Sequence, residues 1–376
     1  MRNALVLGGK LQGVEAAYLM KEAGWHVSLA DKNPDAEASL LANQFFAVDL
    51  LEGDFLVREM RKADLVIPAL EKIDILERID KAAKETGAPL MFGMDAYRVS
   101  CSKKRSDKLF QELGIPVPKP WPECSFPVIV KPSGRSGSEG VRKIGNEKDL
   151  ASFMEEHGDT DWVVQEYLDG SSYSIEIVAR GGRMQTFQVT RLEMDEIYDC
   201  KRVICPSGLS AAQERAFGET AKILAEAVKL EGIMDVEAIL SDGELKVLEI
   251  DARIPSQTPT AVYHATGILM PLVYADMEDA SPPFRCRQSV LYEHVQVKDG
   301  TVWIGGEHLM GGHGPLHRAR NFFGADEALT NYFSGCGEWA ATLILCGSDE
   351  KACRDKHHQV MQSILESMAL TGGERI

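Results

Sequence analysis

The sequence lacks the long apolar run, about 20 residues, that a helix needs to cross a membrane. Its first apolar run, residues 4–7, stops at Gly8-Gly9-Lys10 and is shorter than the apolar part of a secretory signal. The eight cysteines form no C-x-x-C pair and the nine histidines no H-E-x-x-H pattern, so a zinc site is not indicated. Scattered cysteines are typical of reduced thiols, and we expect a cytoplasmic protein.

The sequence also has fewer basic than acidic residues. There are 41 Lys and Arg residues against 57 Asp and Glu, and the net charge is −16. This balance disfavours nucleic acid or an anionic membrane as the main partner. With 376 residues and 44% hydrophobic content, two or three cores are expected, and we predict domains at 1–100, 101–280 and 281–376. The composition leaves a homo-oligomer open.

The first 100 residues alternate buried-strand and helix patterns. Apolar runs at 4–7, 27–30, 64–68 and 89–92 are separated by helical patterns that include 14–23 and 73–83, which predicts a parallel sheet covered on both faces. The segment GGKLQG at 8–13 lacks the G-x-G-x-x-G spacing of a dinucleotide site, although Asp31 lies where a ribose-binding acid would be. Charged residues follow the candidate strand ends and are candidate ligand contacts: Lys10, Asp31, Asp49, Glu71 and Lys72.

A domain change is predicted near 114–124, after a helix at 102–113, because this stretch is rich in proline and glycine. The next strand, 127–132, contains Lys131, and a lysine in an apolar run is costly without an anion. The Gly/Ser-rich loop 133–141 is not a P-loop, but its N–H groups are suited to cover phosphates.

Further elements are expected downstream. We predict a helix at 147–157, a strand at 162–168 with 173–179 as its hairpin partner, and a long helix at 211–230. Residues 254–260 are too proline-rich for a helix, and 263–274 is helical with a break at Pro271. Short strands at 289–297, 301–304 and 339–345 precede a closing helix at 359–368.

The stretch 233–253 predicts a β-hairpin, because two apolar runs flank Ser241-Asp242-Gly243. On the second strand Glu249 and Asp251 are two residues apart and share one face, and Glu237 on the first strand comes opposite them. Such carboxylates repel one another unless a cation lies between them, and Mg²⁺ prefers oxygen ligands. Arg253 faces the same way and its guanidinium suits a phosphate. The hairpin is therefore a candidate metal–triphosphate platform.

Taken in order over residues 1–275, these pieces resemble the ATP-grasp carboxylate–amine ligases. The motifs are VKP with its Gly-rich loop, QEYLDG, and the V-E…L-E-I-D-A-R hairpin. The resemblance implies an α/β ATP-grasp fold with a Rossmann-like N-terminal domain, central ATP-grasp α+β domains and a C-terminal β-rich domain. It also implies ATP and Mg²⁺ as cofactors and amide formation through an acyl phosphate.

The resemblance assigns roles to matching positions. It implies that phosphate is bound by Lys131 and by one of Lys103 or Lys104, with Lys104 favoured, and that the lid is the loop 133–140, with Ser133, Gly137 and Ser138. The implied adenine hinge is formed by Gln165, Glu166 and Leu168. The implied Mg²⁺ ligands are Glu237, Glu249 and Asp251, and the residue that stabilises the acyl phosphate is Arg253. Leu11 and Gln12 are included among the cofactor contacts. Ser172 replaces the ribose-binding glutamate of many relatives, and Asp169 is a candidate substitute.

Within the family, the segments 8–17 and 249–267 resemble ligases that join two small amino acids, with L-lysine supplying the amine. The N-terminal charges would complement lysine, and the loop Pro255, Ser256, Gln257 and Thr258 would contact the activated amino acid. Three alternatives stay open at this point: a carboxylase-type enzyme of the purine pathway, a D-alanine–D-alanine-type ligase, and a nicotinamide-dependent dehydrogenase.

Overall fold

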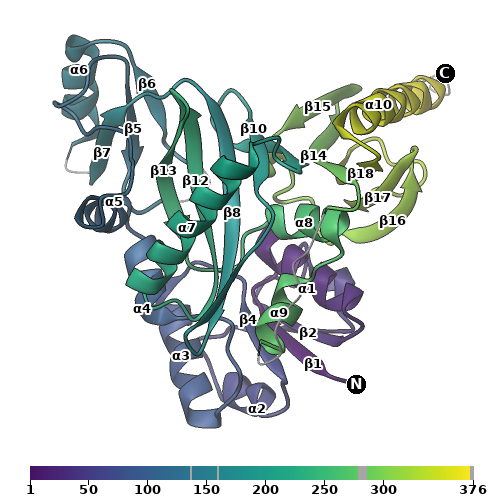
Figure 1. Ribbon diagram of the computed structural model, residues 1–376. Coiled ribbons are helices and arrows are strands. Elements are labelled where there is room, and N and C mark those ends of the chain that lie inside the picture. Colours follow the sequence, from purple (N-terminus) through teal and green to yellow (C-terminus); the bar gives the residue numbers. More distant parts are fainter. Residues whose placement is uncertain (136–137, 159–160, 278–285, 373–376) are drawn as a thin grey trace.

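The computed structural model describes residues 1–135, 138–158, 161–277 and 286–372 (Figure 1). Its N-terminal part is a four-stranded parallel sheet in the order β3-β2-β1-β4. The strands are β1 (Asn3–Leu7), β2 (His26–Asp31), β3 (Gln44–Ala47) and β4 (Leu65–Pro68), and the helices are α1 (Leu11–Glu22), α2 (Phe55–Met60), α3 (Ile73–Thr86) and α4 (Met94–Ser100). Alternate residues of β1 enter different cores, so the sheet is buried on both faces.

A small antiparallel sheet follows, in the order β6-β5-β7. Its elements are α5 (Lys103–Glu112), β5 (Val128–Pro132), β6 (Arg142–Ile144), α6 (Glu147–His157) and β7 (Trp162–Glu166). Val128, Val130 and Ile144 share a core with Leu150 of α6. In Figure 1 this unit lies at the upper left, beside the hairpin β12–β13.

The largest element is an 11-stranded sheet with the path β13-β12-β8-β10-β11-β14-β18-β17-β16, to which β9 and β15 attach. Its strands are β8 (Ser171–Arg180), β9 (Arg183–Thr186), β10 (Thr190–Met194), β11 (Cys200–Cys205), β12 (Gly232–Ser241), β13 (Glu244–Asp251), β14 (Ser289–Lys298), β15 (Thr301–Gly305), β16 (His317–Phe322), β17 (Ala325–Thr330) and β18 (Trp339–Gly347). Strands on either side of residue 280 thus belong to one sheet. The division of the chain at this residue stays a prediction.

Helices cover parts of this sheet. α7 (Ala211–Ala227) packs on β8 and β9, and α10 (Glu350–Gly372) packs on β14 and β18. α8 (Thr258–Thr266) and α9 (Met270–Ala275) lie between the large sheet and α1, and the 3₁₀ turns are η1 (Ser39–Leu41) and η2 (Glu307–Leu309). The predicted α/β fold class is confirmed. Within the described ranges, no helix has both the length and the apolarity of a membrane span.

Three local predictions were wrong. Strands β7 and β8 form no hairpin, because β7 pairs with β5 and β8 pairs with β12 and β10. Gly170 between them is needed for close approach, since a Cβ there would meet the carbonyl oxygen of Leu240 at 2.2 Å. The run 89–92 forms only a parallel bridge between Leu90 and Val66.

The third concerns the proline-rich segment at 254–260. It is not wholly a loop, because α8 begins at Thr258. Pro259 is tolerated in the first turn of this helix, where its missing N–H would have no partner within the helix.

Candidate active site

The hairpin β12–β13 carries two rows of carboxylates on one face. Glu237 pairs directly with Glu249, and Asp235 pairs with Asp251. A bulge beside Glu237 leaves Leu248 outside the pairing register. The carbonyl oxygen of Leu248 accepts a hydrogen bond of 3.2 Å from Lys131 Nζ of β5. The bulge thus brings the small sheet and the hairpin together through a buried lysine.

Burial and mutual repulsion control the protonation of this face. Burial, together with Glu249, raises the pKa of Glu237 to about 8. Burial also raises the pKa of Asp251 to about 6, against the pull of Arg253. At Glu249 burial is outweighed by Lys103 and Lys131, and its pKa is lowered. Carboxylates held this close favour a cation between them.

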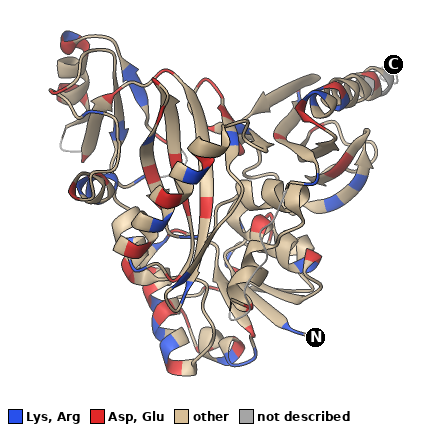
Figure 2. Ribbon diagram, viewed as in Figure 1, with Lys and Arg blue, Asp and Glu red and all other residues tan. Residues whose placement is uncertain are grey.

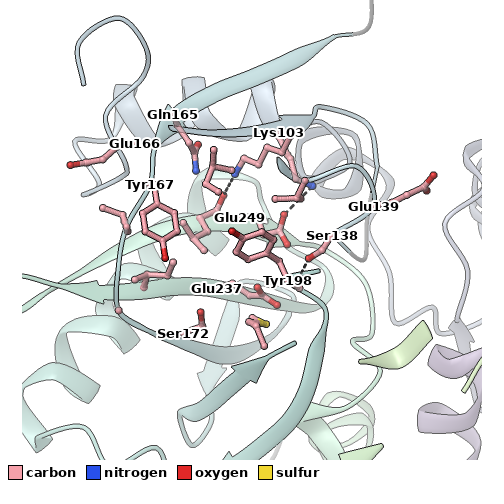
Figure 3. Close-up of a pocket in the computed structure, with 18 of the residues that line it drawn as sticks. Lys103, Ser138, Glu139, Gln165, Glu166, Tyr167, Ser172, Tyr198, Glu237 and Glu249 are labelled. Atoms are coloured by element: carbon pink, nitrogen blue, oxygen red, sulfur yellow. Dashed lines mark hydrogen bonds and ion pairs between the residues drawn. The ribbon is translucent and has the colours of Figure 1, made fainter. Parts of the chain in front are cut away.

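A nucleotide-sized pocket lies between the small sheet and the hairpin (Figure 3). Its apolar walls are Ile129, Val141, Met194, Ile239 and Leu248. The expected hinge residues Gln165, Glu166 and Leu168 all line it, as do Asp169, the candidate ribose contact, and Ser172 and Tyr167. The carboxylates Glu237 and Glu249 close one end, where Lys103 and Lys131 also lie. The pocket thus combines apolar walls for a base with cations for phosphates.

The preference for Lys104 over Lys103 is corrected by the geometry. Lys103 lines the pocket and its Nζ lies 3.0 Å from Glu249 Oε2. Burial lowers the pKa of Lys103, but Glu249 outweighs this, and the net pKa is raised. Lys104 points to Asp161 instead and is half exposed. The two lysines are adjacent on α5, so they face about 100° apart and only one of them reaches the pocket.

The lid loop connects both sides of the pocket. Ser133 is buried and its Oγ accepts a hydrogen bond from Lys104 N. Ser138 Oγ donates a hydrogen bond of 2.6 Å to the carbonyl of Tyr198, in the turn between β10 and β11. Gly137 lies outside the described residues. The described residues Arg135, Ser138 and Glu139 of this loop line the nucleotide pocket.

A second cleft continues from the carboxylate face away from the nucleotide pocket. The loop residues Pro255, Ser256, Gln257 and Thr258 all line it, as predicted for substrate contact, together with Arg253. Arg253 Nε donates a hydrogen bond of 3.0 Å to Glu71, and its Nη2 lies 3.1 Å from Asp251. Burial lowers the pKa of Arg253, but these two carboxylates outweigh it and hold the guanidinium charged.

A third pocket, of about 440 Å³, lies at the carboxyl ends of the N-terminal strands. The five charged residues singled out there by sequence all line it: Lys10, Asp31, Asp49, Glu71 and Lys72. Leu11 and Gln12, which were expected to contact the cofactor, line this third pocket too. Of the two, Gln12 also lines the neighbouring cleft, and neither lines the nucleotide pocket.

Asp31 also has a structural role. Its Oδ2 accepts a hydrogen bond from Gly9 N and its Oδ1 one from Asn33 N, at 2.7 and 2.8 Å. These bonds fix the glycine turn that borders the third pocket.

Several residues of the site were not found from sequence. Tyr198 and Met194 line both the nucleotide pocket and the cleft, and Glu307 of η2 lines both the cleft and the third pocket. Glu15 of α1 accepts a hydrogen bond of 2.5 Å from Thr260 N and so caps α8. Burial raises the pKa of Glu15 to about 8. Glu307 and Glu15 gave no local signal, because their neighbours in space are distant in the chain.

Comparison with known proteins identifies the family. A model of the ATP-grasp domain matches residues 101–257, the part that builds the nucleotide pocket and the hairpin. The 3-methyl-D-ornithine–L-lysine ligase of Methanosarcina barkeri is 37% identical over 309 residues, which cover 81% of this chain and 82% of the relative. The chain belongs to the ATP-grasp ligase family. The resemblance inferred from the motifs is therefore confirmed, and the protein is an ATP-dependent ligase that forms carbon–nitrogen bonds.

More distant similarities agree with this. A D-alanine–D-alanine ligase of Alcanivorax borkumensis is 24% identical over 184 residues, covering 44% of this chain and 58% of the relative. The ADP complex of N5-carboxyaminoimidazole ribonucleotide synthetase superposes with a TM-score of 0.73 at 14% identity, covering 96% of each chain. This structural likeness shows the ATP-grasp fold of the whole chain. Its low identity carries no statement about substrate.

Proposed function

We propose that this enzyme joins 3-methyl-D-ornithine to the ε-amine of L-lysine, with ATP cleaved to ADP and phosphate, as a step of pyrrolysine biosynthesis. ATP first converts the donor carboxylate to an acyl phosphate, because a carboxylate oxygen is a poor leaving group. The amine of lysine then attacks the acyl carbon and phosphate leaves. The names of the relatives support the substrate pair.

The observation that carries the proposal is the order of the three pockets. The nucleotide pocket and the cleft share Glu237 and Glu249, together with Ser138, Met194 and Tyr198. The cleft and the N-terminal pocket share Gln12, Glu71 and Glu307. A triphosphate, a donor carboxylate and an acceptor amine bound in this order would have their reacting atoms adjacent, which supplies much of the rate enhancement.

Two kinds of side chain would activate the donor carboxylate: lysines that neutralise phosphate charge, and carboxylates that hold Mg²⁺. Lys103 and Lys131 lie where the outer phosphates would end, and they would neutralise the charge that moves in phosphoryl transfer. The oxygen donors Glu237, Glu249 and Asp251 fit Mg²⁺, because burial, together with their mutual repulsion, raises the pKa of Glu237 and Asp251, and a bound cation would oppose both effects. A bound Mg²⁺ would polarise the phosphate oxygens. The lid loop would exclude water, which hydrolyses acyl phosphates.

The acceptor half uses the N-terminal pocket. Lysine carries two ammonium groups and one carboxylate, and the opposed charges of Asp49 and Lys72 are complementary to its amino-acid end. Its ε-amine would reach the junction with the cleft, where Glu71 and Glu307 are suited to accept the proton that it must lose. Arg253 would stabilise negative charge on the acyl oxygen.

The other interpretations have less support. In the dehydrogenase interpretation Asp31 would bind a ribose, but both its carboxylate oxygens accept backbone hydrogen bonds of the turn. The carboxylase-type and D-alanine–D-alanine-type interpretations share the fold and the ATP site with our proposal, so substrates must separate them. We retain a cytoplasmic location as part of the proposal.

The test is product formation with amino acids supplied alone and in pairs. We expect ADP release and an amide product, identified by mass spectrometry, only when a D-ornithine-type donor and L-lysine are both present with Mg-ATP. Turnover with bicarbonate, or with D-alanine alone, would replace the proposed substrates by those of the alternative interpretations. An enzyme that releases ADP equally with every amino acid would also contradict the proposal.

A further inference from the structure

The cleft between the nucleotide pocket and the N-terminal pocket has a strong excess of acidic over basic side chains. It is lined by one arginine, Arg253, and by the carboxylates Glu71, Asp199, Asp235, Glu237, Glu249, Asp251 and Glu307. Figure 2 shows acidic positions in red on β12 and β13, and basic positions in blue on the small sheet beside them. A single metal site of three carboxylates does not account for this excess.

Most of these carboxylates have identified partners. Glu71 and Asp251 pair with Arg253, and Glu249 pairs with Lys103. Asp199 accepts a hydrogen bond of 2.7 Å from His308 Nδ1. Glu307 accepts a hydrogen bond from the hydroxyl of Ser256. These side chains are therefore committed within the protein before any substrate is bound.

Asp235 differs from them. It is only 5% exposed, yet it lines the cleft, and among the described residues it forms no ion pair. Its Oδ1 atom has no hydrogen-bond partner in the described part of the chain. Gln257, also buried at 7% exposure and lining the same cleft, has an unpartnered acceptor atom, Oε1. Two residues with buried, unpartnered acceptor oxygens thus line one cleft, and together they suit a hydrogen-bond donor.

The chemistry of these atoms selects the ligand. A buried carboxylate oxygen without a partner costs about 1–3 kcal/mol or more, which a bound cationic donor removes. The register pairs Asp235 with Asp251, which contacts Arg253. This pair is two residues further along the hairpin than Glu237–Glu249, where Lys103 contacts Glu249. It therefore lies on the side where the donor amino acid would continue beyond its reacting carboxylate.

We propose that Asp235, with Gln257 Oε1 beside the same cleft, binds an ammonium group of the donor, so that the cleft selects donor amino acids that carry two amines. This inference rests on the proposed ligase function and specifies its donor class. Asp235 is then a specificity-determining residue that touches the substrate. One face of the hairpin would then bind two ligands: the metal at Glu237, Glu249 and Asp251, and the donor ammonium at Asp235.

The test compares three donors of one chain length: D-ornithine, D-norvaline without the side-chain amine, and 5-aminopentanoate without the α-amine. Each is measured with Mg-ATP and L-lysine, as a substrate or as a competitive inhibitor. We expect the wild-type enzyme to bind D-ornithine best. Asp235→Asn should weaken D-ornithine roughly 10- to 150-fold and leave unchanged the one analogue that lacks the amine held by Asp235.

Glu244→Gln is the control, since Glu244 lies on the neighbouring strand β13 but is exposed and does not line the cleft. It should affect the three donors equally. Asp235→Glu, which keeps the charge, should restore part of the preference for D-ornithine. The KM values for ATP and lysine should change less than about threefold in Asp235→Asn.

Three outcomes would overturn the inference. The first is a wild-type enzyme that uses D-norvaline or 5-aminopentanoate as well as D-ornithine, which would leave the ligase activity standing. The second is an equal loss for all three donors in Asp235→Asn. The third is a raised Mg²⁺ requirement in Asp235→Asn without a change in donor preference, which would assign Asp235 to the metal. Absence of lysine-dependent turnover with every donor would instead refute the proposed function.

Discussion

The nucleotide pocket and the neighbouring cleft share the same two glutamates but differ in their apolar and basic side chains. The pocket has apolar walls, six carboxylates and three basic side chains, Lys103, Lys131 and Arg135. The cleft has one, Arg253, among seven carboxylates. A polyanion suits the first environment and an ammonium-bearing substrate the second. The carboxylate pair Glu237–Glu249 lies at the boundary, where a cation would be attracted by the triphosphate and by the reacting carboxylate of the donor.

The largest effect is expected from substituting a glutamate that lines both the nucleotide pocket and the cleft. Glu249→Gln should reduce ADP release on the order of 10³-fold or more, because it removes a proposed metal ligand and the partner of Lys103. Circular dichroism should show an intact fold. Glu244→Gln, on the exposed start of the same strand, is the control and should keep full activity. Near-wild-type turnover of Glu249→Gln would rule out the metal platform.

Removing a cation from the nucleotide side should weaken ATP binding and spare the amino acids. For Lys131→Met, which keeps most of the buried stem, we expect the ATP dissociation constant to rise on the order of 10²-fold by calorimetry. Lys103→Met should act in the same direction. Lys104→Met should have no effect, because Lys104 points to Asp161. If Lys104→Met weakened ATP and Lys103→Met did not, the assignment of the two lysines would be reversed.

The charged residues of the N-terminal pocket should affect the KM for lysine and not the KM for ATP. Asp49→Asn or Lys72→Met should raise the KM for lysine roughly 10- to 150-fold, provided that KM follows binding. Asp31→Asn should also loosen the turn at Gly9, so its effect includes stability. Asp74→Asn, on α3 outside the pocket, serves as control. An unchanged lysine KM in both Asp49→Asn and Asp31→Asn would move the acceptor to the loop 255–258.

The smallest effect concerns the cap of α8. The ordinary pKa of 4.5 of Glu15 is raised to about 8 by burial, so the folded protein retains a proton that the unfolded chain releases. Stability therefore falls as pH rises from about 4.5 to about 8 and then levels off. Glu15→Gln should remove this dependence, a difference of a few kcal/mol. Urea unfolding at pH 5.5 and 8.5 would measure it, and parallel pH responses of both proteins would contradict it.

Local patterns made the hairpin predictable. The Asp242-Gly243 turn predicted the hairpin, and period two placed Glu249 and Asp251 on one face. Glu249 comes opposite Glu237 only because of the bulge beside Glu237, which the sequence pattern did not predict. The same period assigns Asp235 to that face, but its lack of a partner is visible only in three dimensions.

Other parts of the site depend on contacts distant in the chain. Glu307 reaches the cleft because β14 and β15 extend the large sheet toward the loop at 255–257, and nothing near residue 307 in the sequence records this. The choice between Lys103 and Lys104 depends on the rotation of α5 against the hairpin, which no spacing within the helix determines.

The most direct test of the account is isotope transfer from the donor carboxylate. The enzyme would be given D-ornithine labelled with ¹⁸O in both carboxylate oxygens, together with L-lysine and Mg-ATP. If an acyl phosphate forms at the boundary of the two pockets, each phosphate released carries one ¹⁸O and the amide keeps the other. Unlabelled phosphate would show that ATP cleavage does not activate the carboxylate, and would contradict the account.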